Sequence, residues 1–491
     1  MKFQSIRSTW LPFLLTVVLG FLVMGYHPGM EDDGIYLSAI KSQLNPSLFP
    51  HPDAVFFRLQ LQASFFDNCM AELVRLTGLS IAWTELLGQF FSIGLILWAC
   101  LGIAREVFEE VQAHWASVTM VAAMFTLPVS GTALFIADQH LHPRNLATGF
   151  ILMAVLSVLR NRPWLALPWL AIAGMMHPLM AALGASFTLF AVFVFRPSFL
   201  PDRTVRMATL AVFPIRWLFD PANAGWEAAL NTRTSLHLYR WSWYEWLGAL
   251  APLLLFLVLD HVGRQQGWVR LSLLARCVLA YGIFHQLLAM LLLAPEAPPR
   301  LIPLQPMRYL QLVYLFMVLF AGGLLGRFVL RKSLWRWAVY LLVINGSMFA
   351  AQRAMFPASL HLELPGRSSG NPWLQAFQWI RENTPVNAYF ILNPRYMDEE
   401  GEDYHCFRAL AERSQLADAV KDTAVVTQIP ELADQWKNQL QAENNYENFH
   451  LQDFQRLKST LGVDWAVVAY PQKTALDCRW HNATLAVCRI P

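Results

Sequence analysis

Charged residues are scarce in this chain: they make up 14% of its 491 residues, whereas hydrophobic residues make up 56%. Lysine and arginine form no block anywhere, and the formal net charge of +3 is too small to attract a nucleic acid. Six cysteines are too few for a disulfide-rich scaffold. These shortages argue against a nucleic-acid-binding protein and a small disulfide-stapled fold. The excess of apolar residues instead predicts a polytopic membrane protein.

Several short motifs of soluble enzymes are also missing. The sequence has no Gly-x-Gly-x-x-Gly, no Walker loop, no Gly-x-Ser-x-Gly and no zinc-binding cysteine pattern. Nothing in it therefore indicates a dinucleotide fold, a P-loop or a nucleophile elbow.

Eleven apolar stretches are candidates to cross the hydrocarbon core, for which a helix needs about 20 residues. The first is predicted to be a retained helix, because Tyr26-His27-Pro28-Gly29 follows it where a signal peptide would have a small-x-small cleavage site. The predicted spans cover residues 10–26, 80–103, 115–136, 145–160, 163–176, 178–195, 206–219, 243–260, 271–293, 309–330 and 336–356.

The basic residues of the short loops predict the orientation of these spans. With the first residues in the cytoplasm, the short loops of the opposite side hold only Arg144, Arg300 and Arg308, and the other basic residues gather on the cytoplasmic side. An odd number of spans then places the C-terminal domain outside the cytoplasm, together with the loop that follows the first span.

Charge density predicts a division of the chain near residue 356. Charged residues number 42 in residues 1–356 and 29 in the much shorter stretch 357–491. We therefore expect a transmembrane domain over 1–356 and an extracytoplasmic α/β domain over 357–491. Within the first, residues 27–79 are expected to form an extracytoplasmic loop with amphipathic helices, which typically lie in the membrane interface.

Helix and strand patterns alternate in residues 357–491, which predicts a small α/β sandwich with parallel strands. Helices are expected over 373–381, 407–418, 431–441 and 450–461, and strands over 388–392, 424–427 and 465–470. Cys478 and Cys488 flank a predicted terminal hairpin. They form either a disulfide, which an extracytoplasmic location allows, or two free thiols.

Three consecutive carboxylates, Glu31-Asp32-Asp33, follow the first span within a few residues. Acidic groups at a membrane surface are costly unless they are solvated or used. The run Asp32-Asp33-Gly34-Ile35-Tyr36 resembles the Asp-[Asp/Glu]-x-x-Tyr pattern of the aminoarabinose and protein O-mannosyl transferases. With its many spans, long external loop and external α/β domain, the chain resembles the GT-C superfamily of integral-membrane glycosyltransferases.

This resemblance implies an enzyme that transfers a sugar from a polyprenyl-phosphate carrier to an acceptor on the outer face of a bacterial inner membrane. Asp32 or Asp33 would deprotonate the acceptor, and Tyr36 would belong to the donor-binding site. An acceptor hydroxyl does need a general base within hydrogen-bond reach. The expected partners are the lipid-linked donor, membrane lipids and a glycan, lipid or protein acceptor, with no nucleic acid.

The carrier phosphate needs a permanent cation, and arginine suits this role because it can bind a phosphate bidentately. Arg144 follows Pro143, and Arg308 lies two residues after Pro306. Each is therefore predicted to lie in the first turn of a helix, where the helix end also favours anions. The alternative is that both arginines snorkel to lipid headgroups.

Acid and imidazole side chains alternate over five residues in Asp138, His140 and His142. Such a set is a possible substrate contact or a site for a divalent metal such as Mg²⁺ or Mn²⁺, with Asp32 or Asp33 as a further ligand. An exposed polar loop would explain the same residues without a metal.

Three further polar residues on the predicted outer side are candidates for contact with substrate or metal. His177 precedes Pro178 between two short spans, where it is either a substrate contact or a kink residue. His51 and Asp53 lie in the rigid turn Phe49-Pro50-His51-Pro52-Asp53.

Two other classes of function are open at this point. A transporter or flippase for a lipid-linked or small polar substrate would show paired repeats and broken helices, and no repeat is visible. A non-catalytic envelope assembly protein would use the external domain to bind a partner.

Overall fold

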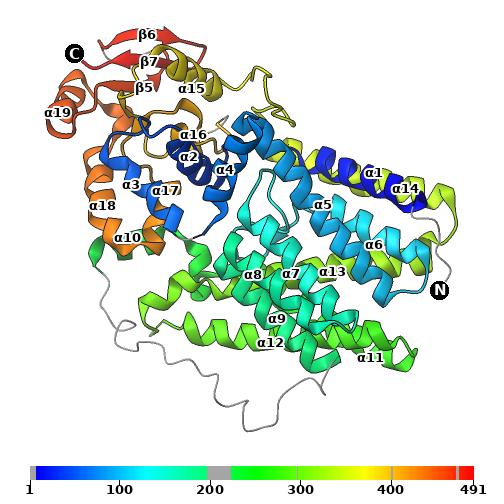
Figure 1. The fold of residues 1–491 in the computed structure, drawn as a ribbon. Helices are drawn as coiled ribbons and strands as arrows, with labels where there is room; N and C mark the ends of the chain where they lie inside the picture. The colour runs from blue at the N-terminus through cyan, green and yellow to red at the C-terminus, as the bar shows by residue number, and fades with distance from the viewer. Residues whose placement is uncertain (1–6, 63, 196–222, 296, 400–401, 472–474) are drawn as a thin grey trace. The chain divides into compact units, whose positions relative to one another are not determined.

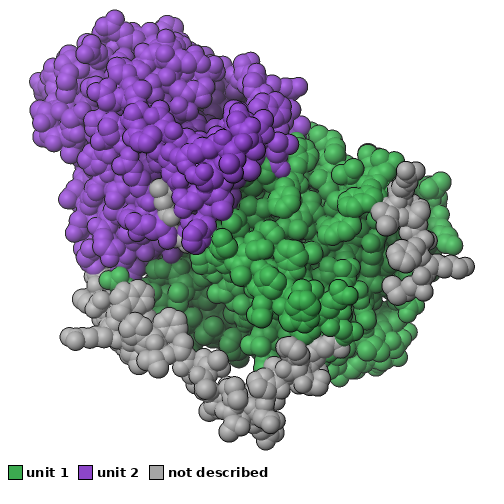
Figure 2. All heavy atoms as spheres, viewed as in Figure 1, with its two compact units in different colours: residues 1–25, 88–221, 233–352 green, residues 26–87, 222–232, 353–491 purple. Residues whose placement is uncertain are grey.

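The computed structural model describes residues 7–62, 64–195, 223–295, 297–399, 402–471 and 475–491. The predicted span at 206–219 lies outside the described residues. The described chain is mostly helical (Figure 1) and divides into two compact units, coloured separately in Figure 2. Unit 1 comprises residues 1–25, 88–221 and 233–352, and unit 2 comprises residues 26–87, 222–232 and 353–491.

Unit 1 holds most of the apolar helices. Six described helical segments are long and apolar enough to cross a membrane: α5 (Ile81–Val107), α9 (Pro178–Phe195), α11 (Trp243–Gln265), α12 (Val269–Leu292), Pro299–Leu330 and α14 (Leu334–Met355). The segment Pro299–Leu330 consists of η8 (Pro299–Leu304), η9 (Pro306–Tyr309), α13 (Leu310–Leu325) and the π-helical turn η10 (Gly326–Leu330). Shorter helices are α1 (Arg7–Met24), α6 (Val111–Ala123), α7 (Pro143–Leu159) and α8 (Ala166–Met176), and short 3₁₀ turns are η3 (Pro163–Leu165), η6 (Thr234–Leu236) and η7 (Leu238–Arg240).

These helices pack as neighbouring pairs and triplets: α11 against α12, α7 against α8 and α9, and α6 against α1 and α13 (Figure 1). The contact of α6 with α13 and η10 depends on small residues. A Cβ atom at Gly322 or Gly326 would lie 2.5 Å from the carbonyl oxygen of Ala116 or Gln112, respectively. Small residues of this kind let helix backbones approach closely in a membrane.

One predicted span differs from the structure. The stretch 115–136 is not a continuous helix, because α6 ends at Ala123 and an antiparallel hairpin of β1 (Pro128–Val129) and β2 (Leu134–Phe135) follows. Pro128 has no amide hydrogen for a helix, and Gly131 adopts a left-handed φ of 65° in the turn. The predicted number of eleven spans is not confirmed.

Unit 2 contains a five-stranded mixed sheet in the order β4-β3-β5-β7-β6. The strands are β3 (Tyr389–Ile391), β4 (Ser414–Gln415), β5 (Trp465–Ala469), β6 (Asp477–His481) and β7 (Leu485–Arg489). β3 is parallel to β4 and β5, whereas β7 is antiparallel to β5 and β6. The predicted strands at 388–392 and 465–470 are confirmed as β3 and β5. The sheet is mixed rather than wholly parallel, because the terminal hairpin extends it.

Alternate residues of the central strands pack into separate cores on the two faces of the sheet, as the two-residue period of a strand requires. Phe390 and Val467 face a core that includes α15 (Pro372–Asn383) and α16 (Phe407–Ala411). Ile391 and Ala466 face a core that includes α19 (Leu451–Leu461). The remaining helices of this half of unit 2 are η11 (Tyr396–Asp398), α17 (Lys421–Gln428), η12 (Pro430–Leu432), α18 (Ala433–Ala442) and η13 (Tyr446–Asn448).

Two predicted elements of this domain are wrong. Residues 424–427 belong to helix α17 rather than to a strand, because the Asp418 carboxylate accepts hydrogen bonds from the amides of Val420 and Lys421 and so caps the helix start. The predicted helix at 407–418 ends at Ala411. Glu412 adopts a left-handed φ of 54°, and the chain continues into β4.

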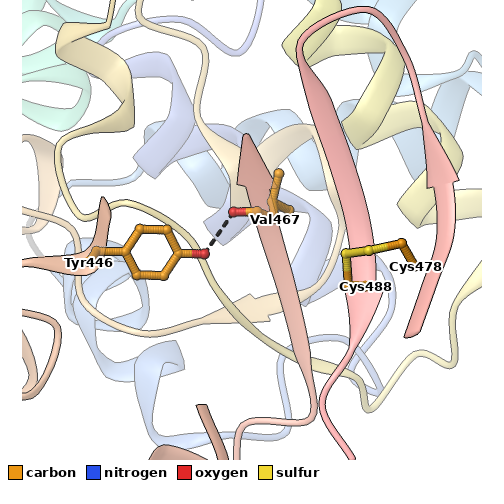
Figure 3. Close-up of a disulfide and its surroundings, with 4 residues drawn as sticks. All are labelled: Tyr446, Val467, Cys478 and Cys488. Carbon is orange, nitrogen blue, oxygen red and sulfur yellow. Dashed lines mark hydrogen bonds between the residues drawn. A yellow bond between two sulfur atoms is a disulfide. The ribbon is translucent and has the colours of Figure 1, made fainter. Parts of the chain in front are cut away.

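Cys478 and Cys488 form a disulfide across β6 and β7 (Figure 3). The figure also shows the Tyr446 hydroxyl donating a hydrogen bond to the carbonyl oxygen of Val467 in β5. The two oxygen atoms are 2.7 Å apart. Of the two states that the sequence allows for these cysteines, the structure therefore has the bonded one.

The segment that follows α1 also belongs to unit 2. It forms α2 (Asp33–Leu44), η1 (Pro52–Ala54), α3 (Val55–Arg58), η2 (Leu59–Gln62) and α4 (Phe66–Thr77), and α10 (Ala224–Thr232) lies against α17 and α18. Nine of the twelve residues of α2 are buried, and Leu37 joins the core that contains α15 and α16. This burial fixes the residues at the start of α2, where the acidic triplet lies.

Candidate functional site

The acidic motif, Glu31-Asp32-Asp33, is held by two later segments of unit 2, residues 361–363 and 404–406. Backbone groups make the hydrogen bonds between these two segments and the residues around the motif. They fix the path of the chain independently of its side chains. They join the Tyr26 amide to the His361 carbonyl (3.0 Å), the Glu363 amide to the Tyr26 carbonyl (2.9 Å), the Glu31 amide to the Tyr404 carbonyl (3.0 Å) and the Cys406 amide to the Gly29 carbonyl (2.9 Å).

A buried ion pair connects these two segments with each other. His405 Nε2 lies 3.0 Å from Glu363 Oε2. Burial alone would lower the pKa of His405, but the Glu363 carboxylate outweighs it and raises that pKa to about 9. Burial alone would raise the pKa of Glu363, yet His405 and His27 bring it to about 2. Both groups are therefore charged near neutral pH, and their attraction keeps the motif's surroundings in place.

The three acids of the motif differ in accessibility. Asp33 is only 1% exposed, and its Oδ2 accepts a hydrogen bond of 2.6 Å from the Gly29 amide. The side chains of Glu31 and Asp32 are 38% and 37% exposed. Asp33 therefore stabilises the turn, whereas Asp32 has a carboxylate that a second molecule can reach.

A buried lysine lies beside the two accessible acids. Lys421 Nζ donates to Glu31 Oε2 and lies 3.4 Å from Asp32 Oδ1. It comes from the first residue of α17, whose start is capped by Asp418. The sequence gives no signal of this contact, because Lys421 is 389 residues away from Asp32.

Asp53, a predicted contact for substrate or metal, lies in a buried charge network. Its Oδ2 accepts hydrogen bonds from Arg408 Nε (2.8 Å) and from the Gln415 amide (3.0 Å). Arg408 also binds both carboxylate oxygens of Asp422, at 2.7 and 2.9 Å. These bonds connect residues 52–54 with α16, β4 and α17. Asp53 therefore has a structural role in unit 2.

The other predicted residues of the loop 27–79 are also in protein contacts. His51 Nε2 is 2.8 Å from the Asn387 carbonyl oxygen, and its ring stacks on Tyr389 with centroids 4.3 Å apart. Tyr36 is 8% exposed and meets Phe66 edge-on at 5.6 Å. Next to that contact is Asp67, a buried acid that sequence reasoning did not single out. Burial, with a smaller contribution from Asp33, raises the pKa of Asp67 to about 7.

A second set of predicted residues lies in unit 1, around the start of α7. Helix α7 begins at Pro143 as predicted, and His142 is its N-cap, with Nδ1 accepting a hydrogen bond of 2.9 Å from the Arg144 amide. Arg144 Nη2 donates to Asp138 Oδ1 at 2.5 Å. Burial would raise the pKa of Asp138, but Arg144 and the two nearby histidines outweigh it and hold that pKa below its ordinary value.

Arg144 is buried with part of its hydrogen-bonding capacity unused. It is 3% exposed, and its Nε and Nη1 atoms have no hydrogen-bond partner among the described residues. Both ring nitrogens of His140, which is 2% exposed, likewise lack a partner in the described part of the chain. Buried polar groups are usually satisfied, so these atoms can take a hydrogen-bond partner such as water or an anion.

The structure brings two other predicted residues close to this group. The rings of His142 and His177 stack with centroids 6.2 Å apart, and His177 connects α8 with α9. Arg308, in the 3₁₀ turn η9 that leads into α13, acts electrostatically on His177, as do His142 and Arg144. Arg144, Arg308 and the three histidines therefore form one basic cluster within unit 1.

A metal fits poorly here. Among the residues that the structure describes, no group of three or more His, Cys, Asp or Glu side chains is arranged to hold a metal ion. Oδ1 of Asp138, the one carboxylate of the predicted set, is bonded by the guanidinium of Arg144. The Arg144 guanidinium would repel a metal cation bound to the same carboxylate.

No family model and no curated protein sequence matches the chain. Among solved structures, it is similar to the oligosaccharyltransferase of Archaeoglobus fulgidus. The structure tethered to an acceptor peptide with the NVT sequon has a TM-score of 0.45 and 12% identity, over 95% of this chain and 69% of that chain.

Two further oligosaccharyltransferase structures from Archaeoglobus fulgidus are similar to the chain. The complex with an inhibitory peptide and a dolichol-phosphate has a TM-score of 0.42 and 11% identity, over 94% of this chain and 70% of that chain. The complex with Zn and sulfate has a TM-score of 0.38 and 12% identity, over 93% and 68%. With TM-scores below 0.5 and identities of 11 to 12%, these matches establish neither a superfamily nor a reaction for this chain.

Proposed function

We propose that this chain is a GT-C-like membrane glycosyltransferase. It transfers a sugar from a polyprenyl-phosphate-linked donor to a glycan, lipid or protein acceptor at the extracytoplasmic face of a bacterial inner membrane. In this proposal Asp32 is the general base, and Arg144 and Arg308 hold the carrier phosphate.

The observation that carries the proposal is the state of Arg144. A guanidinium has five N–H donors and does not lose its charge in proteins. Arg144 is 3% exposed, yet only its Nη2 has a side-chain acceptor, the carboxylate of Asp138, and its Nε and Nη1 have no partner among the described residues. A buried donor without an acceptor costs about 1 to 3 kcal/mol. An anionic phosphate would satisfy both nitrogens with the bidentate geometry that arginine provides.

The proposed general base is Asp32, the accessible aspartate of the acidic motif. Asp32 accepts the proton of the acceptor's hydroxyl or amide group while the acceptor atom forms a bond to the anomeric carbon of the sugar. The bond between that carbon and the phosphate oxygen breaks, and the electron pair leaves with the polyprenyl phosphate, whose charge the arginines balance. Lys421, 3.4 Å from Asp32 Oδ1, holds the carboxylate in place.

A divalent metal, Mg²⁺ or Mn²⁺, is not assigned a step in this mechanism. Activity measured after treatment with a chelator tests whether one is needed. The neighbouring archaeal enzyme was solved with a dolichol-phosphate and with an acceptor peptide, so a lipid phosphate and a peptide are sensible first probes for this chain.

The test is sugar transfer by Asp32→Asn, which keeps the size of the side chain and removes its charge. We expect a loss on the order of 100-fold or more in rate with a normally folded protein, as for a lost general base. Glu431→Gln, at an exposed acid of the same unit, is the matched control and should keep full activity. Full activity of Asp32→Asn would contradict the role of this residue. Movement of a lipid-linked substrate across the membrane without transfer would instead support a transporter.

A further inference from the structure

An apolar groove in unit 1 lies between α14, the C-terminal end of α13 with its π-helical turn η10, and α6. It is a cavity of about 410 Å³. Its lining is almost entirely hydrophobic and includes Met120, Val329, Val339 and Val343, with Arg336 as its charged member. None of these residues belongs to the basic cluster beside α7 or to the acidic motif.

The groove exists because α14 packs loosely. Only 11% of its membrane-length window is buried, against 61% for α5. Tyr340 of α14 packs in a small core with Ala116 of α6 and Leu330 of η10, and its hydroxyl lies 3.2 Å from the Thr119 hydroxyl. Three other residues of α14, Trp337, Leu341 and Ile344, are partly buried against this core. Val339 and Val343, which line the groove, remain 49% and 61% exposed.

Positive charge is concentrated at one end of this groove. The turn between η10 and α14 contains Arg331 and Lys332, and Arg336 follows in the first turn of α14; all three are exposed. Arg331 adopts a left-handed φ of 45° at the end of the π-helical turn, and π-helical turns are frequent at functional sites. Within the described part of the chain, none of these three cations forms an ion pair.

A neighbouring arginine shows the contrast. Arg327 is paired with Glu110 at 3.1 Å and lies over the ring of Trp268 at 4.5 Å. Arg336 also lies over a ring, that of Trp335 at 5.8 Å, but has no ion pair within the described residues. Arg331 and Arg336 donate to the backbone carbonyls of Phe328 and Val329, which leaves most of their donors for another acceptor.

From these observations we propose that the groove binds one anionic phospholipid. An acyl chain lies along the valines of α14, and the phosphodiester headgroup is bound by Arg331, Lys332 and Arg336. The groove is apolar along its length and has three cations without acidic partners at one end. A phospholipid with a hydrocarbon chain and an anionic headgroup is complementary to such a surface. Basic pockets between membrane helices bind anionic headgroups in this way.

The experiment is native mass spectrometry of the full-length protein after incubation with phosphatidylglycerol or phosphatidylethanolamine. The parent protein should retain phosphatidylglycerol in preference. In the triple variant Arg331→Gln, Lys332→Gln, Arg336→Gln this preference should fall by a factor on the order of 100. Each basic residue near an anionic lipid contributes a factor of roughly five, and the three factors multiply. Arg162→Gln, at an exposed arginine outside the groove, is the matched control and should behave as the parent does.

A second variant separates binding in the groove from general attraction to the surface. Val339→Trp fills the groove and leaves all three charges in place, so it should also lower the retention of phosphatidylglycerol. If it has no effect while the triple variant loses binding, the charges act at the surface and the groove proposal is overturned. An unchanged preference in the triple variant, or displacement of phosphatidylglycerol by a much tighter polyprenyl phosphate, overturns it as well.

Discussion

Two buried arginines of this protein differ in how fully their donors are used. Arg408 binds two carboxylates and the carbonyl oxygens of Gln415 and Leu416, so its guanidinium is saturated by the protein. Arg144 has a single carboxylate partner and two nitrogens without acceptors among the described residues. Both arginines are buried, so burial does not distinguish their roles. The hydrogen bonds of Arg408 are all made within unit 2, whereas Arg144 keeps donors for the phosphate in the function that we propose.

We expect Arg144→Lys to weaken donor binding by about 1 to 3 kcal/mol, because lysine keeps the charge and loses the planar fork. Arg308→Lys should have a similar effect if both arginines hold the phosphate. The measurement is the apparent Michaelis constant for the polyprenyl-phosphate sugar. Arg162→Lys, at an exposed position, is the control. Unchanged values in both Arg144→Lys and Arg144→Ala would mean that the phosphate is held elsewhere.

Asp67 should make the stability of the protein depend on pH. Burial raises its pKa to about 7 from an ordinary 3.8, so the folded state favours the protonated acid. The stability that this group contributes is present below about pH 4 and is lost as the pH rises through 7, at a total of roughly 4 kcal/mol. Asp67→Asn cannot ionise. It should match the parent's melting temperature near pH 4 and exceed it at pH 8.

The control for this prediction is Glu431→Gln, which removes an exposed acid from the same unit. Its melting temperature should follow that of the parent protein at both pH values. If Asp67→Asn shows no gain at pH 8, the carboxyl is neutralised or solvated in a way that its burial does not indicate.

Elements that follow from local pattern were predicted well, and those that depend on distant partners were not. Residues 388–392 and 465–470 are short, nearly continuous apolar runs in the sequence, so β3 and β5 were predicted. The apolar run Ala424–Thr427 looks like a strand in isolation, but the cap from Asp418 makes it a helix. The acidic motif was found because its three acids are adjacent. Lys421 was missed because only folding brings it there.

The hairpin of β6 and β7 should depend moderately on its disulfide. Cys478 and Cys488 are 10 residues apart, and closing such a loop contributes at most about 3 kcal/mol in the chain-entropy model. Cys478→Ser should therefore lower the unfolding temperature without abolishing the sheet, which the core around Ile391 and Ala466 also holds. The bond itself is checked by thiol labelling of the denatured protein before and after reduction. Labelling of both cysteines without reductant would show that the bond is absent.

At the scale of the whole molecule, the predicted topology places unit 2 outside the cytoplasm, and an oxidised cysteine pair agrees with such a compartment. Cys69 is a native reporter, because it is exposed in the loop 27–79, whereas the other free cysteines of the described chain are buried. An impermeant maleimide should label Cys69 in intact cells with access to the outer face of the membrane.

The matched control is Arg162→Cys in a Cys69→Ser background. Arg162 is exposed in a loop that the positive charges predict to be cytoplasmic, so this cysteine should react only after lysis. The reverse pattern would place the acidic motif in the cytoplasm, which contradicts the proposed site of transfer.

Lys421 and Glu31 are in contact but lie 390 residues apart in the sequence. This contact can therefore form only some time after the motif has been synthesised. At about 5 to 20 residues per second, translation needs on the order of 20 to 80 s to travel from the motif to its lysine. During that interval the motif also lacks the backbone partners that residues 361–363 and 404–406 provide. A nascent chain therefore carries the first helix and its acids in the membrane without a formed site. The contacts around the motif can form only when the ribosome has passed residue 421, and a chain that stalls earlier lacks them.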